Sequence, residues 1–241
     1  MNLLEVQNLD KSFRGLRAVS AVSFGVTANS ITALIGPNGA GKTTLFNLIA
    51  GTLAPDSGII SFAGTRIDGL RPDQICARGI GRTFQIVKPF AGLTVLDNVI
   101  VGALHRTAKV ALARSHAEEI LAKLGLESKR DLPAAALTLP DRKRLEVARA
   151  LATKPKLLLL DEAMAGLRPT ECDQMVAVLR EINQREGITL LLIEHVMRAV
   201  MALAGKVIVL HHGEIIGAGT PAEVVRQPTV VASYLGETGD L

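Results

Sequence analysis

The chain has 241 residues, of which 48% are hydrophobic and 21% are charged. These values suit one large α/β domain with a packed core, and they exclude a disordered chain. The net charge is only +4, and the chain has one Tyr and no Trp, whereas single-stranded nucleic acid needs several exposed rings to stack on. We therefore interpret the scattered basic residues, including the group Arg142-Lys143-Arg144, as surface charge and expect no nucleic-acid partner.

Cysteine spacing and apolar runs limit the compartment and the relation to membranes. Cys76 and Cys172 lie far apart in no CxxC or Cys/His spacing, which is typical of buried thiols in a reducing compartment. The first six residues lack the basic start and apolar core of a signal peptide. Long apolar runs such as 157–160 and 188–193 have strand length, well short of the ~20 residues that a membrane span needs. These patterns predict a soluble chain that reaches a membrane only through partners.

The first quarter of the chain predicts β-structure followed by one helix. The expected elements are antiparallel strands at 3–9 and 19–26 with a polar turn at Arg14 and Gly15, a strand at 30–35, a helix at 42–50, and a strand at 58–63. The strand at 30–35 ends abruptly in Gly36, and the helix stops at Gly51. A strand, a glycine loop and a helix therefore follow one another here.

The middle of the chain is helical in composition, and short strands return after it. Residues 108–124 are rich in Ala, Leu, Glu and Lys, and residues 141–151 repeat apolar positions at helical spacing. Because the region from about 93 to 151 has no strong strand pattern, it predicts a helical insertion. Runs that are apolar after their first residue follow at 156–160, 189–193 and 206–210. Such runs are typical of parallel strands that are buried on both faces.

The glycine loop matches GxxxxGK followed by Ser or Thr at every fixed position. It reads Gly36, Pro37, Asn38, Gly39, Ala40, Gly41, Lys42 and Thr43, and Thr44 follows in the helix. Glycines let backbone N–H groups curl around phosphate oxygens, and the helix start adds its positive dipole end. The pattern predicts an ATP site in which Lys42 reaches the β- and γ-phosphates and the Thr43 hydroxyl binds Mg²⁺. A chance glycine turn is the alternative, and the position between strand and helix disfavours it.

Two carboxylates end the apolar run that begins at residue 157. Asp161 is expected beside the phosphate loop, where it holds Mg²⁺ directly or through water. Glu162 is then expected to face the γ-phosphate and to polarise the attacking water. The alternative is a strand that runs into a solvated acidic loop, and the phosphate loop upstream disfavours it.

The order of these features resembles that of the ABC transporter ATPases. The resemblance rests on Phe13, the phosphate loop, Gln85, the segment 137–151, Asp161 with Glu162, and His195, and it covers essentially the whole chain. It implies an α/β fold with a P-loop NTPase (RecA-like) core, an N-terminal antiparallel β subdomain and an inserted α-helical subdomain. Residues 1–241 are expected to form a single ABC ATPase domain, with its core at about 1–90 and 152–241 and its helical subdomain at about 91–151.

The resemblance also implies roles for three residues outside the phosphate loop. In that family an aromatic residue upstream of the loop stacks on adenine, which implies this role for Phe13, although the ring could also merely pack a strand. Gln85 matches a glutamine that contacts Mg²⁺ and water. His195 matches a histidine that touches the γ-phosphate, so Glu162, His195 and Gln85 form the expected catalytic group. The histidines at 105, 116, 211 and 212 are expected to be structural.

The family's signature, Leu-Ser-Gly-Gly-Gln, is altered in this chain. The sequence there reads Leu137, Thr138, Leu139, Pro140 and Asp141. In these ATPases the signature presents a hydroxyl and backbone N–H groups to the nucleotide on a second subunit, but Pro140 has no N–H and Asp141 is negatively charged. Thr138 and Asp141 predict a capping box that occupies donors at the helix start. We therefore expect the signature to support a weak or non-hydrolytic site.

The loop after the acidic pair departs from the family as well. Ala163 stands where proline is usual, and Arg168 stands where Asp or Asn is usual. That loop communicates across the dimer in this family. The two departures together predict unequal nucleotide sites, especially if the partner is a different ATPase chain with an intact signature. The chain is expected to form a homodimer or a heterodimer with a second ABC ATPase.

Within the family, the chain is similar to ATPase subunits of high-affinity branched-chain amino acid importers. The similar stretches are 11–13, 144–149, 193–197, 219–221 and 233–236. Lipopolysaccharide-export ATPases share much of this pattern. The resemblance implies transmembrane permease partners, a separate substrate-binding protein, and a cytoplasmic position on the inner face of the inner membrane. A soluble ABC ATPase acting on ribosomes or DNA and a regulatory subunit without turnover are the alternatives.

Overall fold

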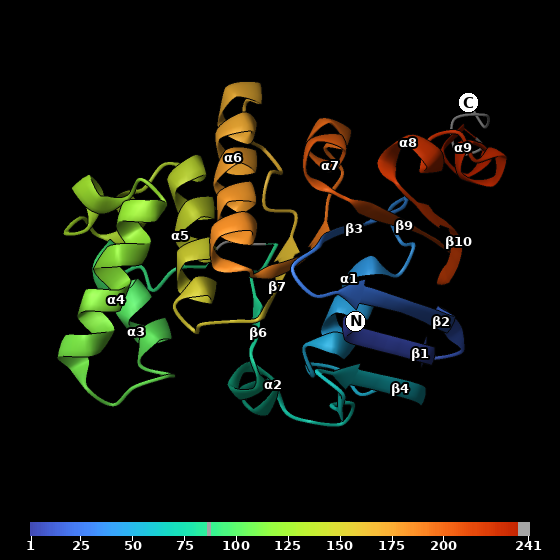
Figure 1. Cartoon of the computed structure of the whole chain (residues 1–241), viewed down its shortest axis with the longest axis horizontal. Coiled ribbons are helices and arrows are strands. Elements are labelled where there is room, and N and C mark those ends of the chain that lie inside the picture. The colour runs from blue at the N-terminus through green and yellow to red at the C-terminus, as the bar shows by residue number, and fades with distance from the viewer. Residues whose placement is uncertain (86–87, 236–241) are drawn as a thin grey trace.

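The computed structural model describes residues 1–85 and 88–235 as two β-sheets with helices packed around them (Figure 1). The smaller sheet is antiparallel and has the order β2-β1-β4-β5. Its strands are β1 (Asn2–Phe13), β2 (Leu16–Thr27), β4 (Ser57–Phe62) and β5 (Thr65–Arg66). The predicted turn is confirmed, because Arg14 and Gly15 both have positive φ between β1 and β2. The strands exceed their predicted length because polar residues such as Lys11 and Ser12 continue the cross-strand pairing beyond the apolar stretch.

The larger sheet contains the predicted parallel strands. Its order is β10-β9-β3-β8-β7-β6, and only β10 runs antiparallel to its neighbour. The strands are β3 (Ile31–Ile35), β6 (Ile80–Arg82), β7 (Leu157–Asp161), β8 (Thr189–Ile193), β9 (Lys206–His211) and β10 (Glu214–Gly219). Strand β6 was not predicted, because Ile80, Gly81 and Arg82 are too few and too mixed in character to give a strand pattern.

The helices lie on both sides of the larger sheet and beyond its β6 edge (Figure 1). They are α1 (Lys42–Ile49), α2 (Pro72–Arg78), α3 (Val95–Ala103), α4 (Val110–Lys123), α5 (Leu139–Leu151), α6 (Pro169–Glu186), α7 (Met197–Leu203), α8 (Pro221–Val224) and α9 (Pro228–Leu235), with 3₁₀ turns at Glu127–Lys129 and Ala134–Ala136. Helices α3, α4 and α5 pack together, as a helical insertion requires. The exact division of the chain at 91 and 151 stays a prediction.

The larger sheet separates two apolar clusters. Leu157 and Leu159 of β7 pack in one cluster with helix α1 and the smaller sheet, and Leu158 and Leu160 pack in the other with helices α5 and α6. All four side chains are fully buried. Alternate residues of a strand face opposite sides, so both faces of β7 are covered. This packing fixes the end of β7, where Asp161 lies, between the two apolar clusters.

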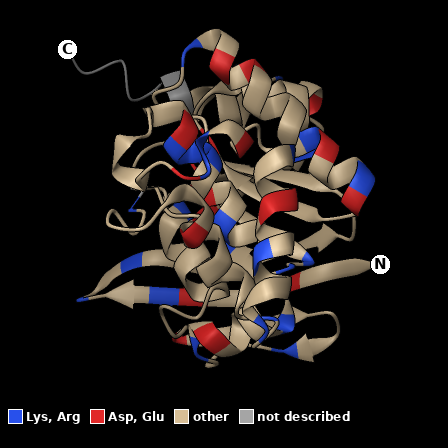
Figure 2. Ribbon diagram, turned by 90° about the vertical axis from the view of Figure 1, so that its left-hand side faces the viewer, with Lys and Arg blue, Asp and Glu red and all other residues tan. Residues whose placement is uncertain are grey.

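The structure also tests the expectations about the cysteines, the charges and the membrane. Cys76 and Cys172 are both free; Cys172 is buried as predicted, whereas Cys76 is only half-buried. Figure 2 shows Lys and Arg interspersed with Asp and Glu, in accord with the modest net charge of +4. Within residues 1–85 and 88–235, none of the helices combines the length and the apolar character that crossing a membrane requires.

Candidate active site

The phosphate loop joins β3 to α1, as the sequence predicts, and two of its glycines cannot be replaced without a clash. Gly36 has a φ of 149°, and a Cβ there would overlap the carbonyl oxygen of Leu210 in β9. Gly41 has a φ of 102°, and a Cβ there would overlap the carbonyl oxygen of Ala18 in β2. The loop is thus held tightly between β9 and β2. Gly39 also has a positive φ, but it faces open space.

Lys42 lies at the start of α1, with its side chain folded back over the loop. Its side-chain Nζ donates hydrogen bonds to the carbonyl oxygens of Gly36, at 2.7 Å, and Pro37, at 2.8 Å, and the residue is 6% exposed. The first N–H groups of a helix have no partner within the helix, so the start of α1 offers donors beside a fixed ammonium group. Thr43, the next residue, is exposed and lines a 460 Å³ cavity together with Asp161. This arrangement suits a phosphate chain.

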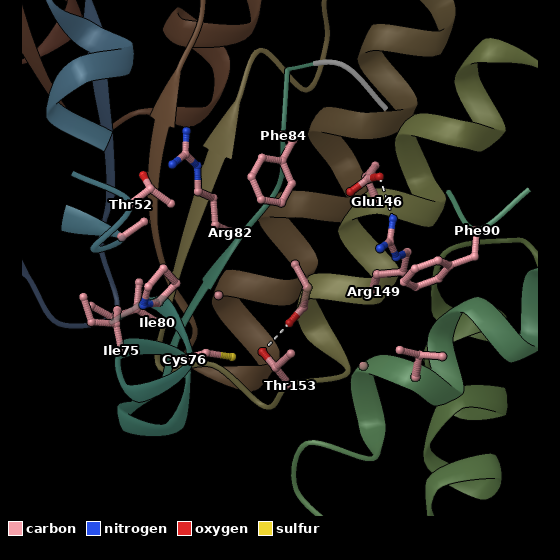
Figure 3. A pocket seen from close by; sticks show the side chains of 16 residues that line it. Thr52, Ile75, Cys76, Ile80, Arg82, Phe84, Phe90, Glu146, Arg149 and Thr153 are labelled. Carbon is pink, nitrogen blue, oxygen red and sulfur yellow. Dashed lines mark hydrogen bonds and ion pairs between the residues drawn. The ribbon is translucent and has the colours of Figure 1, made fainter. Parts of the chain in front are cut away.

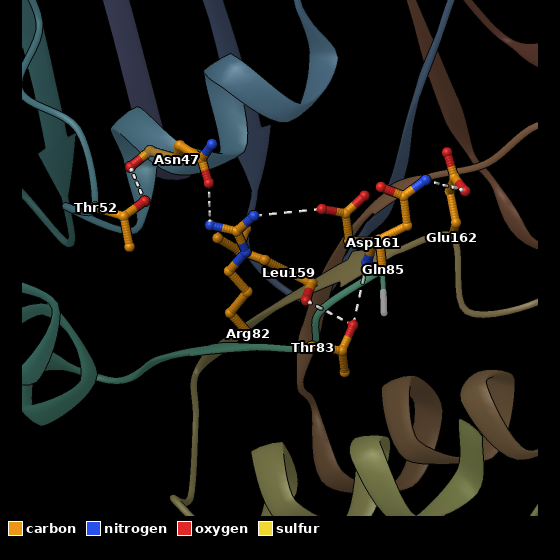
Figure 4. A network of polar contacts seen from close by, with 8 residues as sticks. All are labelled: Asn47, Thr52, Arg82, Thr83, Gln85, Leu159, Asp161 and Glu162. Atoms are coloured by element: carbon orange, nitrogen blue, oxygen red, sulfur yellow. Dashed lines mark hydrogen bonds and ion pairs between the residues drawn. The ribbon is translucent and has the colours of Figure 1, made fainter. Parts of the chain in front are cut away.

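Asp161 ends β7 and is 2% exposed. Its Oδ2 accepts a hydrogen bond from Arg82 at 3.3 Å, and Arg82 also donates to Asn47 of α1 at 2.7 Å (Figure 4). Burial raises the pKa of Asp161, and the Arg82 charge opposes that rise. Its Oδ1 is buried and has no hydrogen-bond partner in the described part of the chain. Such an oxygen, next to the Thr43 hydroxyl and the Gln85 amide in one cavity, fits the oxygen ligands that Mg²⁺ prefers.

Glu162 is held by residues from two distant segments. Gln85 Nε2 donates to its Oε2 at 2.9 Å (Figure 4), and His195 Nε2 lies 3.0 Å from its Oε1. When Glu162 is ionised, this contact requires the His195 Nε2 to carry the proton. Glu162 itself has a φ of 50°, which is rare for a residue with a side chain. The structure therefore brings together the three residues that the sequence analysis groups as catalytic.

The comparison with protein families decides which class of ATP site this is. The family described as ABC transporter matches residues 19–165, which is more than half of the chain. The chain belongs to the ABC transporter family. It is therefore an ATPase of that family, and its fold agrees with solved cassettes. A nucleotide-free ATP-binding cassette from an ABC transporter superposes with a TM-score of 0.89 and 31% identity, covering 97% of this chain and 99% of the other. A cassette in its ADP conformation gives a TM-score of 0.89 and 32% identity, covering 98% and 99%.

Relatives of this ABC ATPase match it from end to end. The high-affinity branched-chain amino acid transport ATP-binding protein LivG of Salmonella typhimurium is 38% identical, with 98% of each chain covered. BraF of Pseudomonas aeruginosa, with the same description, is 36% identical with 98% of each covered. The lipopolysaccharide export system ATP-binding protein LptB of Haemophilus influenzae is 35% identical, again over 98% of each chain.

Phe13 lies at the tip of the β1–β2 hairpin of the ABC ATPase. Its ring is 42% exposed, and the Lys11 ammonium lies 5.7 Å from the ring centroid. The hairpin reaches the phosphate loop because β2 packs against Gly41 at Ala18. The ring is thus free to stack on a ligand, and adenine stacking stays a prediction.

The altered signature begins α5, but the predicted capping box is wrong. Thr138 is the N-cap residue, yet its side chain caps no backbone N–H. Its hydroxyl instead donates to the Asp141 carboxylate at 2.7 Å, and Lys129 pairs with the same oxygen. Burial raises the pKa of Asp141, but these two hydrogen bonds outweigh burial and the pKa falls. Thr138 and Lys129 thus both bond to the Asp141 carboxylate, and no side-chain hydrogen bond caps the start of α5. Pro140 still contributes no N–H.

Sequence reasoning missed several residues around Glu162 and Asp161. Arg82 of β6 donates to Asp161, and Asn47 of α1 accepts a second hydrogen bond from Arg82. Lys143, interpreted above as surface charge, is 6% exposed and donates to the Glu162 carbonyl oxygen at 2.7 Å. Glu194 is 1% exposed and accepts the Met164 N–H at 2.9 Å. The signal for these two residues was weak. Lys143 lies four residues after Leu139 and four before Val147, and Glu194 directly follows the strand at 189–193.

Proposed function

We propose that this chain is the ATP-binding and ATP-hydrolysing subunit of an ABC importer for branched-chain or other amino acids. The observation that carries the hydrolytic role is Glu162, clamped between Gln85 and His195 beside Asp161 and the phosphate loop. The importer assignment follows from the 38% identity to LivG over nearly the full length of both chains. The 35% identity to LptB supports a lipopolysaccharide-type exporter as the second candidate.

Each predicted site residue has a place in this proposal. Phe13 stacks on adenine, and residues 36–44 hold the phosphates with their backbone N–H groups and the Lys42 ammonium. Thr43, Gln85 and Asp161 hold Mg²⁺, which supplies charge neutralisation at the phosphates when bound. Glu162 accepts a proton from the attacking water, and His195 keeps the carboxylate oriented and contacts the γ-phosphate.

Closure of a dimer over ATP transmits force to permease subunits through a groove beside the site. The groove has a volume of 270 Å³ and lies between α2, β6, α3 and α5 (Figure 3). Phe84 and Phe90, which are 56% and 46% exposed, line it with Val101 of α3. Exposed apolar side chains around a hollow are typical of a protein-binding surface. We assign this groove to a permease segment, and the substrate-binding protein acts on the permease from the other side of the inner membrane.

The permease surface can be tested with a matched pair of variants. Val101→Glu places a charge in the groove and should abolish co-purification with the permease subunits. Leu112→Glu, at an exposed position of α4 outside the groove, should leave co-purification intact. Equal assembly of both variants would reject the groove as the docking surface.

Paired with an ABC ATPase whose signature is intact, this chain would form a dimer with two unequal ATP sites. Pro140 supplies no N–H, and the Asp141 carboxylate is ionised beside the start of α5. A partner ATPase with an intact signature would therefore complete the site built on Glu162, while the site that uses Leu137–Asp141 would turn over slowly or not at all. Steady-state ATP hydrolysis of the purified chain, alone and mixed with such a partner, tests this. Equal activity per site in both preparations would end the proposal.

Substitution of Glu162 separates a hydrolytic subunit from a regulatory one with little turnover. In the assembled complex, Glu162→Gln should abolish ATP hydrolysis while ATP binding persists, because the amide cannot accept a proton. Unchanged hydrolysis would remove Glu162 from the catalytic role. Uptake of labelled leucine into proteoliposomes that contain the complex then distinguishes the amino-acid importer from the exporter.

A further inference from the structure

Two buried charged residues beside the site have no place in the roles proposed so far. Lys143 lies on α5 and is 6% exposed, and Glu194 follows β8 and is 1% exposed. Charged groups are expensive to bury unless they are paired and hydrogen-bonded. The burial of Lys143 and Glu194 therefore needs a structural explanation.

Both residues hold the loop that follows β7. Lys143 Nζ donates to the backbone carbonyl oxygen of Glu162 at 2.7 Å. Glu194 Oε1 accepts the backbone N–H of Met164 at 2.9 Å. Burial lowers the pKa of Lys143, and the nearby Glu194 carboxylate opposes that shift. The loop is thus held at residues 162 and 164, from α5 and from the end of β8.

The loop needs such support because its first residue has an unfavourable backbone conformation. Glu162 has a φ of 50°, in the left-handed region that residues with a Cβ seldom adopt. Its N–H donates to the Ile193 carbonyl oxygen at 2.9 Å, which fixes one side of the residue. Rotation to a negative φ would relieve the strain, but it would swing the side chain away from Gln85 and His195. The Lys143 hydrogen bond fixes the other side of the same residue and opposes that rotation.

We propose that Lys143 and Glu194 are positioning residues that hold the loop 162–164 so that the Glu162 carboxylate lies between Gln85 and His195. Lys143 couples helix α5 to the Glu162 carboxylate. A displacement of α5, whose N-cap is Thr138, therefore changes the geometry at Glu162. The effect on turnover rests on the catalytic role proposed for Glu162. The effect on the loop does not.

Hydrogen–deuterium exchange of the full chain without nucleotide tests the loop directly. In Lys143→Met, which keeps the length of the side chain and removes the donor, the peptide spanning residues 161–168 should exchange at least about tenfold faster. Lys143→Arg retains a donor and should exchange like the unmodified chain. Arg144→Met removes a charge from the neighbouring position of α5, where the guanidinium bonds to Gln174, and should leave this peptide unchanged. Unchanged exchange in Lys143→Met overturns the proposal.

Glu194 is tested by separating its hydrogen bond from its charge. Glu194→Gln keeps an acceptor for the Met164 N–H and should preserve slow exchange in the peptide 161–168. Glu194→Ala removes the acceptor and should accelerate exchange there. Equal exchange in the two variants would show that the hydrogen bond does not hold the loop. Circular dichroism melts of each variant test whether the fold is retained. If Lys143→Met fails to fold, Lys143→Arg becomes the test variant. Fast exchange of the peptide 161–168 in Lys143→Arg would then contradict the proposal.

Turnover then connects the loop to catalysis. For Lys143→Met we expect kcat to fall on the order of 10²-fold, because a misplaced catalytic group costs about that much. The KM for ATP should stay unchanged, and Lys143→Arg should restore kcat. If Lys143→Met keeps its kcat while Glu162→Gln has lost hydrolysis, the positioning role is rejected and the catalytic role of Glu162 stands. Unchanged hydrolysis in Glu162→Gln would reject the proposed catalytic role, and the exchange experiment would still decide the loop.

Discussion

The burial of Glu194 predicts a stability profile that depends on pH. Burial raises the pKa of Glu194 from its ordinary value of 4.5 to about 7, against the hydrogen bond from Met164. Between these values the carboxyl is protonated in the folded chain and ionised in the unfolded chain. The folded state then binds the extra proton, so the free energy of unfolding falls as pH rises through this window. Above about pH 7 the full destabilisation is present, and below 4.5 it is absent.

The size of the effect follows from the width of that window. The interval from 4.5 to about 7 spans about 2.5 pH units, which at 1.36 kcal/mol per unit gives about 3 kcal/mol. Glu194→Gln removes the titration and keeps the acceptor for Met164. The variant should therefore match the unmodified chain at pH 4.5 and exceed its stability by up to about 3 kcal/mol at pH 8. Lys143, which loses its counter-charge in the variant, reduces this gain.

Urea denaturation followed by far-UV circular dichroism measures this difference, since the chain has no Trp for fluorescence. The measurements run from pH 4.5 to 8 in EDTA without nucleotide. Lys143, Glu162 and Cys172, whose charges interact with Glu194, are the same in both proteins. Glu181→Gln, at an exposed residue paired with Arg185, is the control and should not reproduce the gain at pH 8. A stability gain of Glu194→Gln that is flat in pH, or that grows towards acid, would refute the reasoning.

Three further predictions concern the phosphate loop, the metal ligand and the core. Gly36→Ala should abolish ATP binding and lower the melting temperature, because the new Cβ would overlap the Leu210 carbonyl oxygen. Gly39→Ala faces open space and should lose only about 1 kcal/mol of unfolding free energy in a urea titration. Asp161→Asn should weaken Mn²⁺ binding measured by electron paramagnetic resonance at least about tenfold, and equal Mn²⁺ affinity would exclude Asp161 as a ligand. Leu159→Ala, fully buried in β7, should cost about 2–5 kcal/mol of unfolding free energy.

Local pattern alone determined the phosphate loop and the buried strands of this chain. The loop could be predicted because its chemistry needs contiguous residues between a strand and a helix, and β3 and α1 lie where the pattern placed them. Strand β8 was predicted to the residue because four consecutive apolar residues after a β-branched threonine are typical of a buried strand. The family followed from the order of such segments along the chain.

Only the tertiary structure decided which distant side chains meet. Gln85 and His195 lie 77 and 33 residues from Glu162 along the chain, and they meet it because strands and loops far apart in sequence end at the same place. The burial of Lys143 and the pairing of Lys129 with Asp141 escaped prediction for the same reason. The partner of a charged side chain is set by long-range packing, whereas a sequence pattern records only period and polarity. The expected capping box is wrong on that point, since the Thr138 hydroxyl donates to the Asp141 carboxylate, which Lys129 also binds, and caps no backbone N–H.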